Sequence, residues 1–514
     1  MKYDAVRIEI DDSGWTDISP YVSRIHNLSW SRGIVGNRVT DRVARPGRIS
    51  FVLYDETGQF DPIYTGAIIK SGSPVRFSVE KDGIRRYLWY GKIKDVSPRE
   101  NDLYKVFAQV SGACKIDDYN RPLITPTITT NKTATEVVDE ISDDLNLTIT
   151  DSQKEYGTMD KTFTAVFDTS RSKQNALGEI SKAIMSELGY FYAKGTREAD
   201  DNFILTVDGR NTREARSYIT IPVGTTDSGF LLKEDGGLLL KEDGGKIILD
   251  KAETFDEFSI MSGKQLSYGK NVLNDVIVTV YPKEYSGTTV VVFSLTSTPA
   301  IEAGETIELL VKYRDPDQEA QSITARATET PVANTDYTAN AERDGSGADL
   351  TANLTVTAVY GAAEIKYTLE NTGGTKLRVT MLQARGEGIF FYGTVKLEAE
   401  DSASQATYGV KVLNLNQKYL DSVADGQTNA DAILASTKDL FPDVDWIEID
   451  ANASDQNLFA CMYLDIGDPI KIPLKNASGA IESRKFYING INWSGENGNW
   501  TVRYIIASQE VTEI

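Results

Sequence analysis

An alternation of large apolar side chains near the start of the chain most constrains what it can fold into. Ile49, Phe51 and Leu53 alternate with Ser50, Val52 and Tyr54, at the two-residue period of a half-buried β-strand. Asp, Thr and Gly follow directly at 55–58, and these residues favour a turn. We therefore predict a β-meander rather than an active site. One shared β-core is expected to contain Trp30, Phe51, Leu53 and Phe60.

Two segments of the sequence resemble one known family. The first comprises Trp15-Thr-Asp17-Ile18, Trp30-Ser-Arg32-Gly33 and Gly58-Gln-Phe60-Asp61-Pro62, and it is similar to the opening of distal tail proteins of long-tailed bacteriophages. These are the baseplate-hub or minor tail proteins. The second segment, Leu464-Asp-Ile-Gly467-Asp-Pro-Ile470-Lys-Ile472, resembles the strand of their barrel domain that helps to build the tube wall. The likeness is specific in the N-terminal β-region and looser over most of the rest.

The resemblance implies a structural component of a phage tail tip. Such a hub closes or extends the tail tube and connects it to host-recognition fibres. A homotrimer is implied, with the distal tail or tube protein, the tape measure protein and a tail fibre as partners. The expected location is the virion tail, assembled in the host cytoplasm. The expected fold class is mainly β with an α+β module, multidomain, with tail-tube-like β-barrel domains and an inserted immunoglobulin-like β-sandwich.

The first two domains are expected at 1–117, an N-terminal β hub domain, and at 118–226, an α+β module. Lys81-Asp82-Gly83 predicts a hairpin turn in the first. Thr133-Ala-Thr-Glu136 has the form of a capping box and predicts a helix in the second. Another helix is predicted over 170–188, ending at Gly189 as its left-handed cap residue.

A duplicated segment lies at the start of the next expected domain, 227–282, which we interpret as a β-hairpin arm and the start of a second barrel domain. Leu231-Leu-Lys-Glu-Asp-Gly-Gly237 recurs as Leu239-Leu-Lys-Glu-Asp-Gly-Gly245. Phosphate or calcium binding is the alternative to a hairpin. A phosphate loop needs a following Lys-Ser/Thr on a helix and calcium needs a longer ligand set, so the hairpin is favoured.

Residues 283–391 are expected to be an inserted β-sandwich, because short alternating strands are separated by turn residues. Its flanks, Val272–Tyr281 and Tyr392–Glu398, are expected to pair. Two oxygen-rich loops, Asp315–Glu319 and Ala341–Asp349, are either calcium sites or ordinary acidic turns, and neither matches a complete ligand pattern.

The last expected domain, 392–514, is the C-terminal part of the second β-barrel domain with one helix. That helix is predicted over Asn429–Leu440, with Pro442 as its stop. Strands are predicted around 446–449, 463–472, 486–493 and 500–506.

The formal charge of −21 argues against specific nucleic-acid binding, which needs clustered Lys and Arg. An acidic lumen that repels passing DNA is one hypothesis, and simple solubility is the other. The two cysteines, Cys114 and Cys461, are expected to be buried free thiols. The N-terminus lacks a secretory-signal pattern and no stretch approaches the ~20 apolar residues that cross a bilayer, so we expect no transmembrane segment.

Catalysis is not predicted, and neither catalytic, cofactor-binding nor metal-binding residues are proposed from the sequence. His26 is the single histidine and is interpreted as structural. Paired carboxylates of the glycosidase kind remain an alternative, but 75 Asp and Glu residues make such pairs unspecific. The alternative from another class is a cell-surface or carbohydrate-binding adhesin that uses the inserted sandwich. The insertion has no Trp, which leaves Tyr313, Tyr337, Tyr360 and Tyr367 for stacking on sugars.

Overall fold

The computed structural model describes most of the chain in separate ranges. They are 5–23, 26–55, 59–60, 67–101, 105–124, 128–167, 175–196, 202–213, 215–217, 266–268, 271–318, 322–475, 481–496 and 498–507. The duplicated segment at 227–250 and the Asp61-Pro62 dipeptide lie outside the described residues, so the hairpin-arm interpretation stays a prediction.

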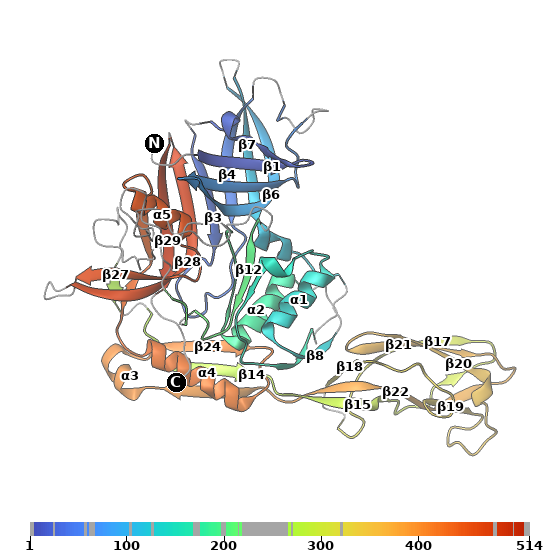
Figure 1. Ribbon diagram of the computed structural model, residues 1–514. Helices are drawn as coiled ribbons and strands as arrows, with labels where there is room; N and C mark the ends of the chain where they lie inside the picture. The colour runs from blue at the N-terminus through green and yellow to red at the C-terminus, as the bar shows by residue number, and fades with distance from the viewer. Residues whose placement is uncertain are drawn as a thin grey trace, which may run out of the picture.

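An eleven-stranded sheet forms the largest part of the molecule (Figure 1). Along the sheet its order is β2-β1-β5-β6-β7-β4-β3-β28-β29-β26, with β27 paired to β28. The N-terminal strands are β1 (Ala5–Asp11), β2 (Trp15–Asp17), β3 (Leu28–Gly33), β4 (Arg48–Asp55), β5 (Pro74–Lys81), β6 (Ile84–Asn101) and β7 (Lys105–Cys114). The C-terminal strands are β26 (Trp446–Asp450), β27 (Pro469–Lys475), β28 (Ile481–Glu496) and β29 (Asn499–Ala507). The mainly β fold class is confirmed.

The two ends of the chain share this sheet, which differs from the expectation of two separate barrel-like domains. Strand β28 pairs antiparallel with β3, from Gly490 opposite Gly33 to Gly495 opposite Leu28. The sheet is an open path, because its outer strands β2 and β26 do not pair with each other in the described residues. Long-range pairing of this kind leaves no local signal in the sequence, since the alternation of side chains along a strand is the same whichever strand it pairs with.

The N-terminal strands follow the predicted pattern closely. The β5–β6 hairpin turns at Asp82 and Gly83, whose φ angles are 53° and 74°. These positive φ values are those of a two-residue turn that suits Asp-Gly. The four residues predicted to share a core are all buried, and they belong to one hydrophobic cluster: Trp30, Phe51, Leu53 and Phe60.

In its described residues, the α+β module contains two helices and five short strands. They are β8 (Thr129–Lys132), α1 (Ala134–Asp144), β9 (Lys154–Tyr156), β10 (Phe163–Val166), α2 (Ala176–Glu187), β11 (Tyr190–Lys194) and β12 (Ile204–Asp208). The predicted capping box is present, because the Thr133 side chain accepts from the Glu136 amide and the Glu136 carboxylate accepts from the Thr133 amide.

The predicted role of Gly189 at the end of α2 is wrong. Leu188 is the residue in the left-handed conformation, with φ of 58°. Gly189 is required for a different reason, since a Cβ there would lie 2.4 Å from the carbonyl oxygen of Asp208. Glycine therefore permits the close approach of β11 and β12.

A small three-stranded sheet follows, in the order β23-β14-β24, and α4 packs against it. Its elements are β14 (Asp275–Val280), β23 (Val395–Glu400), β24 (Val412–Gln417) and α4 (Val423–Thr437). The flanks of the insertion pair as predicted, with Val280 opposite Val395. The predicted helix bounds are wrong: α4 begins earlier, because the Ser422 side chain caps the amide of Asp425, and Pro442 opens a strand instead.

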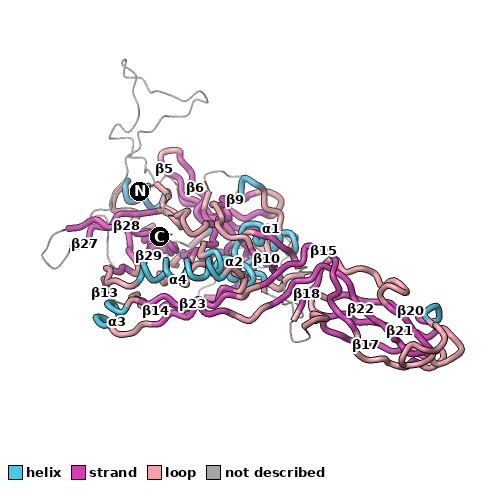
Figure 2. Tube along the Cα trace, turned by 90° about the horizontal axis from the view of Figure 1, so that it is seen from below, coloured by secondary structure: helices cyan, strands magenta, loops and turns pink. Residues whose placement is uncertain are grey.

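An arm formed by two sheets projects from the rest of the molecule between β14 and β23 (Figures 1 and 2). The five-stranded sheet contains β15 (Lys283–Ser294), β16 (Ala300–Ile301), β18 (Ile323–Arg326), β19 (Tyr337–Asn340) and β22 (Leu377–Phe391). The three-stranded sheet contains β17 (Thr306–Lys312), β21 (Glu364–Asn371) and β20 (Leu354–Tyr360). Residues of both sheets form one core, in which Phe293 contacts Tyr367 at 6.2 Å between ring centroids.

Two further helices and a strand pair were not predicted. They are α3 (Ser402–Tyr408), α5 (Asp455–Tyr463), β13 (Leu266–Tyr268) and β25 (Pro442–Val444). The strand predicted from residue 463 is wrong at its start. Tyr463 is the last residue of α5, and β27 begins only at Pro469.

No helix among the described residues is both long enough and apolar enough to span a bilayer.

Candidate functional site

The two segments that resemble tail proteins meet inside the molecule. Arg32 of β3 donates to both carboxylate oxygens of Asp465, at 2.6 and 2.9 Å. The Arg32 side chain is 5% exposed and that of Asp465 is 14% exposed. A two-pronged pair of this kind fixes both side chains in one geometry. The fold thus joins positions that are 433 residues apart in sequence.

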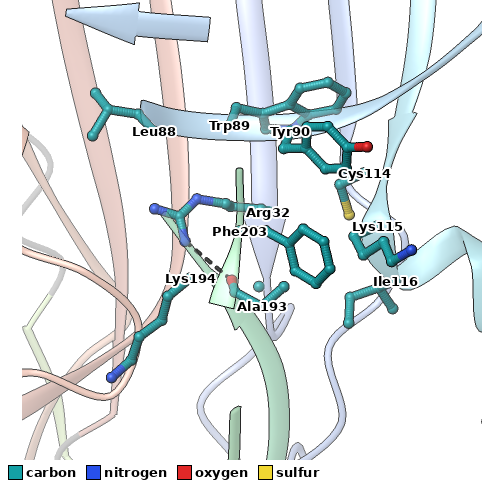
Figure 3. A pocket seen from close by; sticks show the side chains of 11 residues that line it. Arg32, Leu88, Trp89, Tyr90, Cys114, Lys115, Ile116, Ala193, Lys194 and Phe203 are labelled. Carbon is teal, nitrogen blue, oxygen red and sulfur yellow. Dashed lines mark hydrogen bonds between the residues drawn. The ribbon is translucent and has the colours of Figure 1, made fainter. Parts of the chain in front are cut away.

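The α+β module contacts the same ion pair. The amide of Gly195, just after β11, donates to Asp465 at 2.9 Å, and Arg32 also donates to the carbonyl oxygen of Ala193 at 3.1 Å. Figure 3 shows the Arg32 guanidinium directed at this carbonyl. Three parts of the chain therefore converge here: the N-terminal strands, the α+β module and the turn before β27. We call the contacts around Arg32 and Asp465 the joint.

Contacts within the structure explain why the turn at 464–468 has Asp at 465 and 468 and Gly at 467. Asp468 accepts from the amide of Asp465 at 2.6 Å, which closes the turn. Gly467 has φ of 86°, and a Cβ there would lie 2.1 Å from Arg216 and 2.2 Å from the hydroxyl of Tyr192. Only glycine fits this contact without displacing the two side chains.

A second group of buried charges lies beside that turn, and we count it as part of the joint. Arg216 donates to the Tyr192 hydroxyl at 2.7 Å and to Asp208 at 2.8 Å, and the Tyr192 hydroxyl donates to Asp208. Arg213 reaches across to β28 and donates to Asn489 at 2.8 Å. Burial strongly raises the pKa of Tyr192, so its hydroxyl keeps its proton. The group stabilises one arrangement of the parts.

Asp468 is the titratable member of the joint. Burial raises its pKa to about 7, with Lys194 and Arg216 lowering it and Asp465 raising it. The unfolded value is about 3.9, so between roughly pH 4 and 7 the folded chain holds a proton that the unfolded chain has released. The stability that this proton contributes is therefore lost as the pH rises through that window.

We expect Asp468→Asn to remove this pH dependence, because the amide keeps the acceptor and never ionises. Relative to the unsubstituted chain, the variant should gain roughly 2–3 kcal/mol of unfolding free energy between pH 5 and pH 8. Denaturant unfolding at both pH values measures it, with the exposed Asp317→Asn as control. If the variant and the unsubstituted chain differ in unfolding free energy by the same amount at both pH values, Asp468 is ionised throughout.

The cavity that the described residues form at Arg32 is too small for a ligand. The space lined by Arg32, Tyr90, Cys114 and Phe203 has a volume of about 10 Å³, which suits about one water molecule (Figure 3). Cys114 and Cys461 are buried free thiols, as predicted. Burial raises the pKa of both, which makes thiolate chemistry at neutral pH unfavourable.

The remaining candidate residues of the sequence lie in local structural contacts. The hydroxyl of Ser23 and Nδ1 of His26 are 2.7 Å apart. Asp344 accepts from the amide and hydroxyl of Ser346, at 3.0 and 2.6 Å, which is an ordinary acidic turn. Across the ranges that the structure describes, no group of three or more His, Cys, Asp or Glu side chains is placed to hold a metal ion.

Two of the four tyrosines that a sugar-binding arm would need are unavailable. Tyr313 is 2% exposed and Tyr367 is fully buried, and both belong to the core of the arm. Tyr360 donates to the carbonyl oxygen of Glu329. These contacts weigh against stacking of sugar rings on Tyr313 and Tyr367.

Sequence reasoning missed the buried arginines that hold the parts together. Arg42, Arg210 and Arg213 are at most 1% exposed. Arg42 donates to the carbonyl oxygen of Val39 at 2.7 Å and to that of Leu188, while Arg210 donates to Asn429 of α4 at 3.0 Å. Arginine is usually exposed, and no pattern in the sequence marks these three as buried.

The chain was compared with family models, curated proteins and solved structures, and only solved structures match. No family model matches the sequence, and neither does any curated protein. Among solved structures, the chain is similar to a 43 kDa tail protein of prophage MuSo2 from Shewanella oneidensis, at 10% identity and a TM-score of 0.46, over 98% of this chain and 99% of that chain. A tail protein from Neisseria meningitidis matches at 7% identity and a TM-score of 0.46, over 98% and 96%. A prophage tail protein from Listeria monocytogenes matches at 8% identity and a TM-score of 0.40, over 97% and 94%.

Proposed function

We propose that the chain is a structural component of a bacteriophage tail tip, a hub that closes or extends the tail tube and connects it to host-recognition fibres. The observation that carries the proposal is the contact between Arg32 and Asp465. Each residue belongs to one of the two segments that resemble tail proteins, and the fold places them in direct contact. Two independent resemblances that meet at one point are better explained by a shared architecture than by coincidence.

The role we propose is mechanical and not enzymatic. The joint holds three parts of the chain by buried charge pairs and glycine contacts, which suits a subunit that must keep its shape under load. Its natural partners are then the distal tail or tube protein, the tape measure protein and a tail fibre, in the virion tail after assembly in the host cytoplasm. The charge of −21 fits a lumen through which DNA passes without specific binding.

The domain boundaries are part of the proposal. We propose a β hub domain at 1–117, an α+β module at 118–226, a β-hairpin arm and the start of a second β-domain at 227–282, an immunoglobulin-like insertion at 283–391 and the C-terminal part of that second β-domain with one helix at 392–514. The second β-domain joins the first through the pairing of β28 with β3. The insertion enters and leaves through the adjacent ends of β14 and β23, where Val280 and Val395 are partners. An insertion at such a point leaves the paired strands intact.

We expect three copies of the chain around the tube axis, as the resemblance to tail hub proteins implies. A reconstruction of the tail tip of virions that contain the chain, together with native mass spectrometry of that tip, measures the copy number. The matched variant replaces 283–391 with a short Gly-Ser linker and should still give three copies. One copy, or a ring of six, would contradict the hub proposal.

A further inference from the structure

The arm carries a ligand-sized groove that lies outside the joint. It has a volume of about 820 Å³ and lies along β15, with β22 and the loop after β17 as its other walls. Volumes of this size hold small molecules or short peptide segments. Its apolar residues are Val290 and Val291 of β15, Phe390 of β22 and Pro316 of the loop.

Strand β15 offers a short stretch of open edge at the groove, Thr289–Val291, which ends where the carbonyl oxygen of Val292 accepts from the amide of Arg314 at 3.0 Å. In the part of the chain that the structure describes, β22 is the strand that pairs with β15, and the order of the sheet leaves β15 outermost. The register between them shifts on both sides of Thr289–Val291, between Tyr285 and Thr289 and again between Val291 and Phe293. Between the two shifts the register is unbroken, so Val290 and Val291 lie on opposite faces of the sheet, and the groove at the edge of the strand touches both.

The charges around the groove are mostly negative. Asp315, Asp317 and Glu329 line it together with a single cation, Arg385. Arg385 is already engaged, because it donates to Asp336 at 2.6 and 3.0 Å and pairs with Glu329 at 2.9 Å. Although burial opposes it, the hydrogen bond from Arg385 holds the pKa of Asp336 below its usual range. The guanidinium is therefore engaged by carboxylates within the arm, and Asp315 and Asp317 add negative charge at the rim.

We propose that this groove binds an extended peptide segment of a partner protein in which Lys or Arg alternates with apolar residues. The segment adds to the edge of β15 at Thr289–Val291 through main-chain hydrogen bonds, with apolar side chains on Val290 and Phe390 and cationic side chains beside Asp315 and Asp317. Charge complementarity selects a cationic occupant over an anionic one. A bare cation is not the occupant we propose, since the described residues hold no metal-binding cluster.

The test uses the purified full-length chain and a fluorescent eight-residue peptide of alternating Lys and Val. Saturable binding is expected, measured by fluorescence anisotropy at about 0.15 M salt, where distant surface charges are largely screened. Peptides of alternating Glu and Val, or Lys and Ser, should bind at least tenfold more weakly. The double variant Asp315→Asn with Asp317→Asn should weaken binding at least fivefold, and Val291→Lys at least tenfold.

Matched controls carry the same chemistry elsewhere on the arm. Glu308→Gln with Glu370→Gln removes two charges from the exposed face of the other sheet, and Val359→Lys adds a cation at a valine that is 71% exposed. Both should leave peptide affinity and the circular dichroism spectrum unchanged. The proposal is overturned if the Lys-Ser peptide binds as well as the Lys-Val peptide, if the controls weaken binding as much as the groove variants, or if none of the peptides binds. These measurements do not depend on assembly into a tail.

Discussion

Replacing Trp493 with alanine is expected to lower the free energy of unfolding by ~3–5 kcal/mol. Trp493 is 1% exposed and lies directly opposite Trp30, where β28 joins β3. Their rings stack at 5.7 Å between centroids, and Phe77 and Trp500 surround them at 5.8 and 6.2 Å. The substitution would leave a cavity at the seam between the two ends of the chain, where both the N-terminal and C-terminal strands supply the walls.

Denaturant unfolding followed by circular dichroism measures this loss, and two further variants make it specific. Trp493→Phe keeps a stacking ring and should lose less than half as much. Trp446→Ala removes a partly exposed tryptophan whose ring lies 4.1 Å from the Arg503 guanidinium, and it should cost about 1 kcal/mol. Similar losses for Trp493→Ala and Trp446→Ala would mean that the seam is not a cooperative core.

Local features of the fold were predictable because their causes lie within a few residues. The Thr133-to-Glu136 capping box and the Asp82-Gly83 turn each depend on side chains or φ values inside one short segment. The alternation from Ile49 to Leu53 places Ile49, Phe51 and Leu53 on one buried face of β4, while Val52 is buried on the other face. Patterns of this kind specify helices, turns and strand faces without reference to the rest of the chain.

The order of the strands in the sheet was not predictable, because pairing partners are chosen by contacts far apart in sequence. Nothing near Trp493 marks it as the neighbour of Trp30, and the C-terminal strands read equally well as a separate domain. Helix α5 was missed for a related reason. Every residue from Asn457 to Tyr463 is buried, so α5 lacks the polar stripe by which a surface helix is recognised.

The joint was predictable in part. The resemblance singled out both Arg32 and Asp465, but only as members of separate segments, and their contact required the fold. The buried cluster of Asp208, Tyr192 and Arg216 left no sequence signal beyond an Asp-Gly-Arg passage. Buried ionic groups are rare, and sequence alone cannot tell an arginine at a joint from one in solvent.

The ion pair at the joint leads to the second large expected effect. Asp465→Ala should lower the free energy of unfolding by ~3–5 kcal/mol, because it leaves the Arg32 guanidinium buried without its carboxylate. It also removes the acceptor of the Gly195 amide. Glu448→Ala is the matched control. Its partner Arg503 is 46% exposed, at 2.8 Å, and such a pair contributes only about 0–1 kcal/mol.

A double variant separates the worth of the pair from the cost of an orphaned charge. Arg32→Met with Asp465→Leu replaces both ions with apolar side chains of similar reach, and it should recover most of the stability lost in Asp465→Ala. Recovery would mean that the pair serves to fix the geometry of the three parts more than to stabilise them. The double variant should then show faster amide hydrogen exchange at Gly195 and in the turn at 464–468. If Asp465→Ala instead costs no more than Glu448→Ala, Arg32 reaches solvent or another anion, and the joint does not hold these parts together.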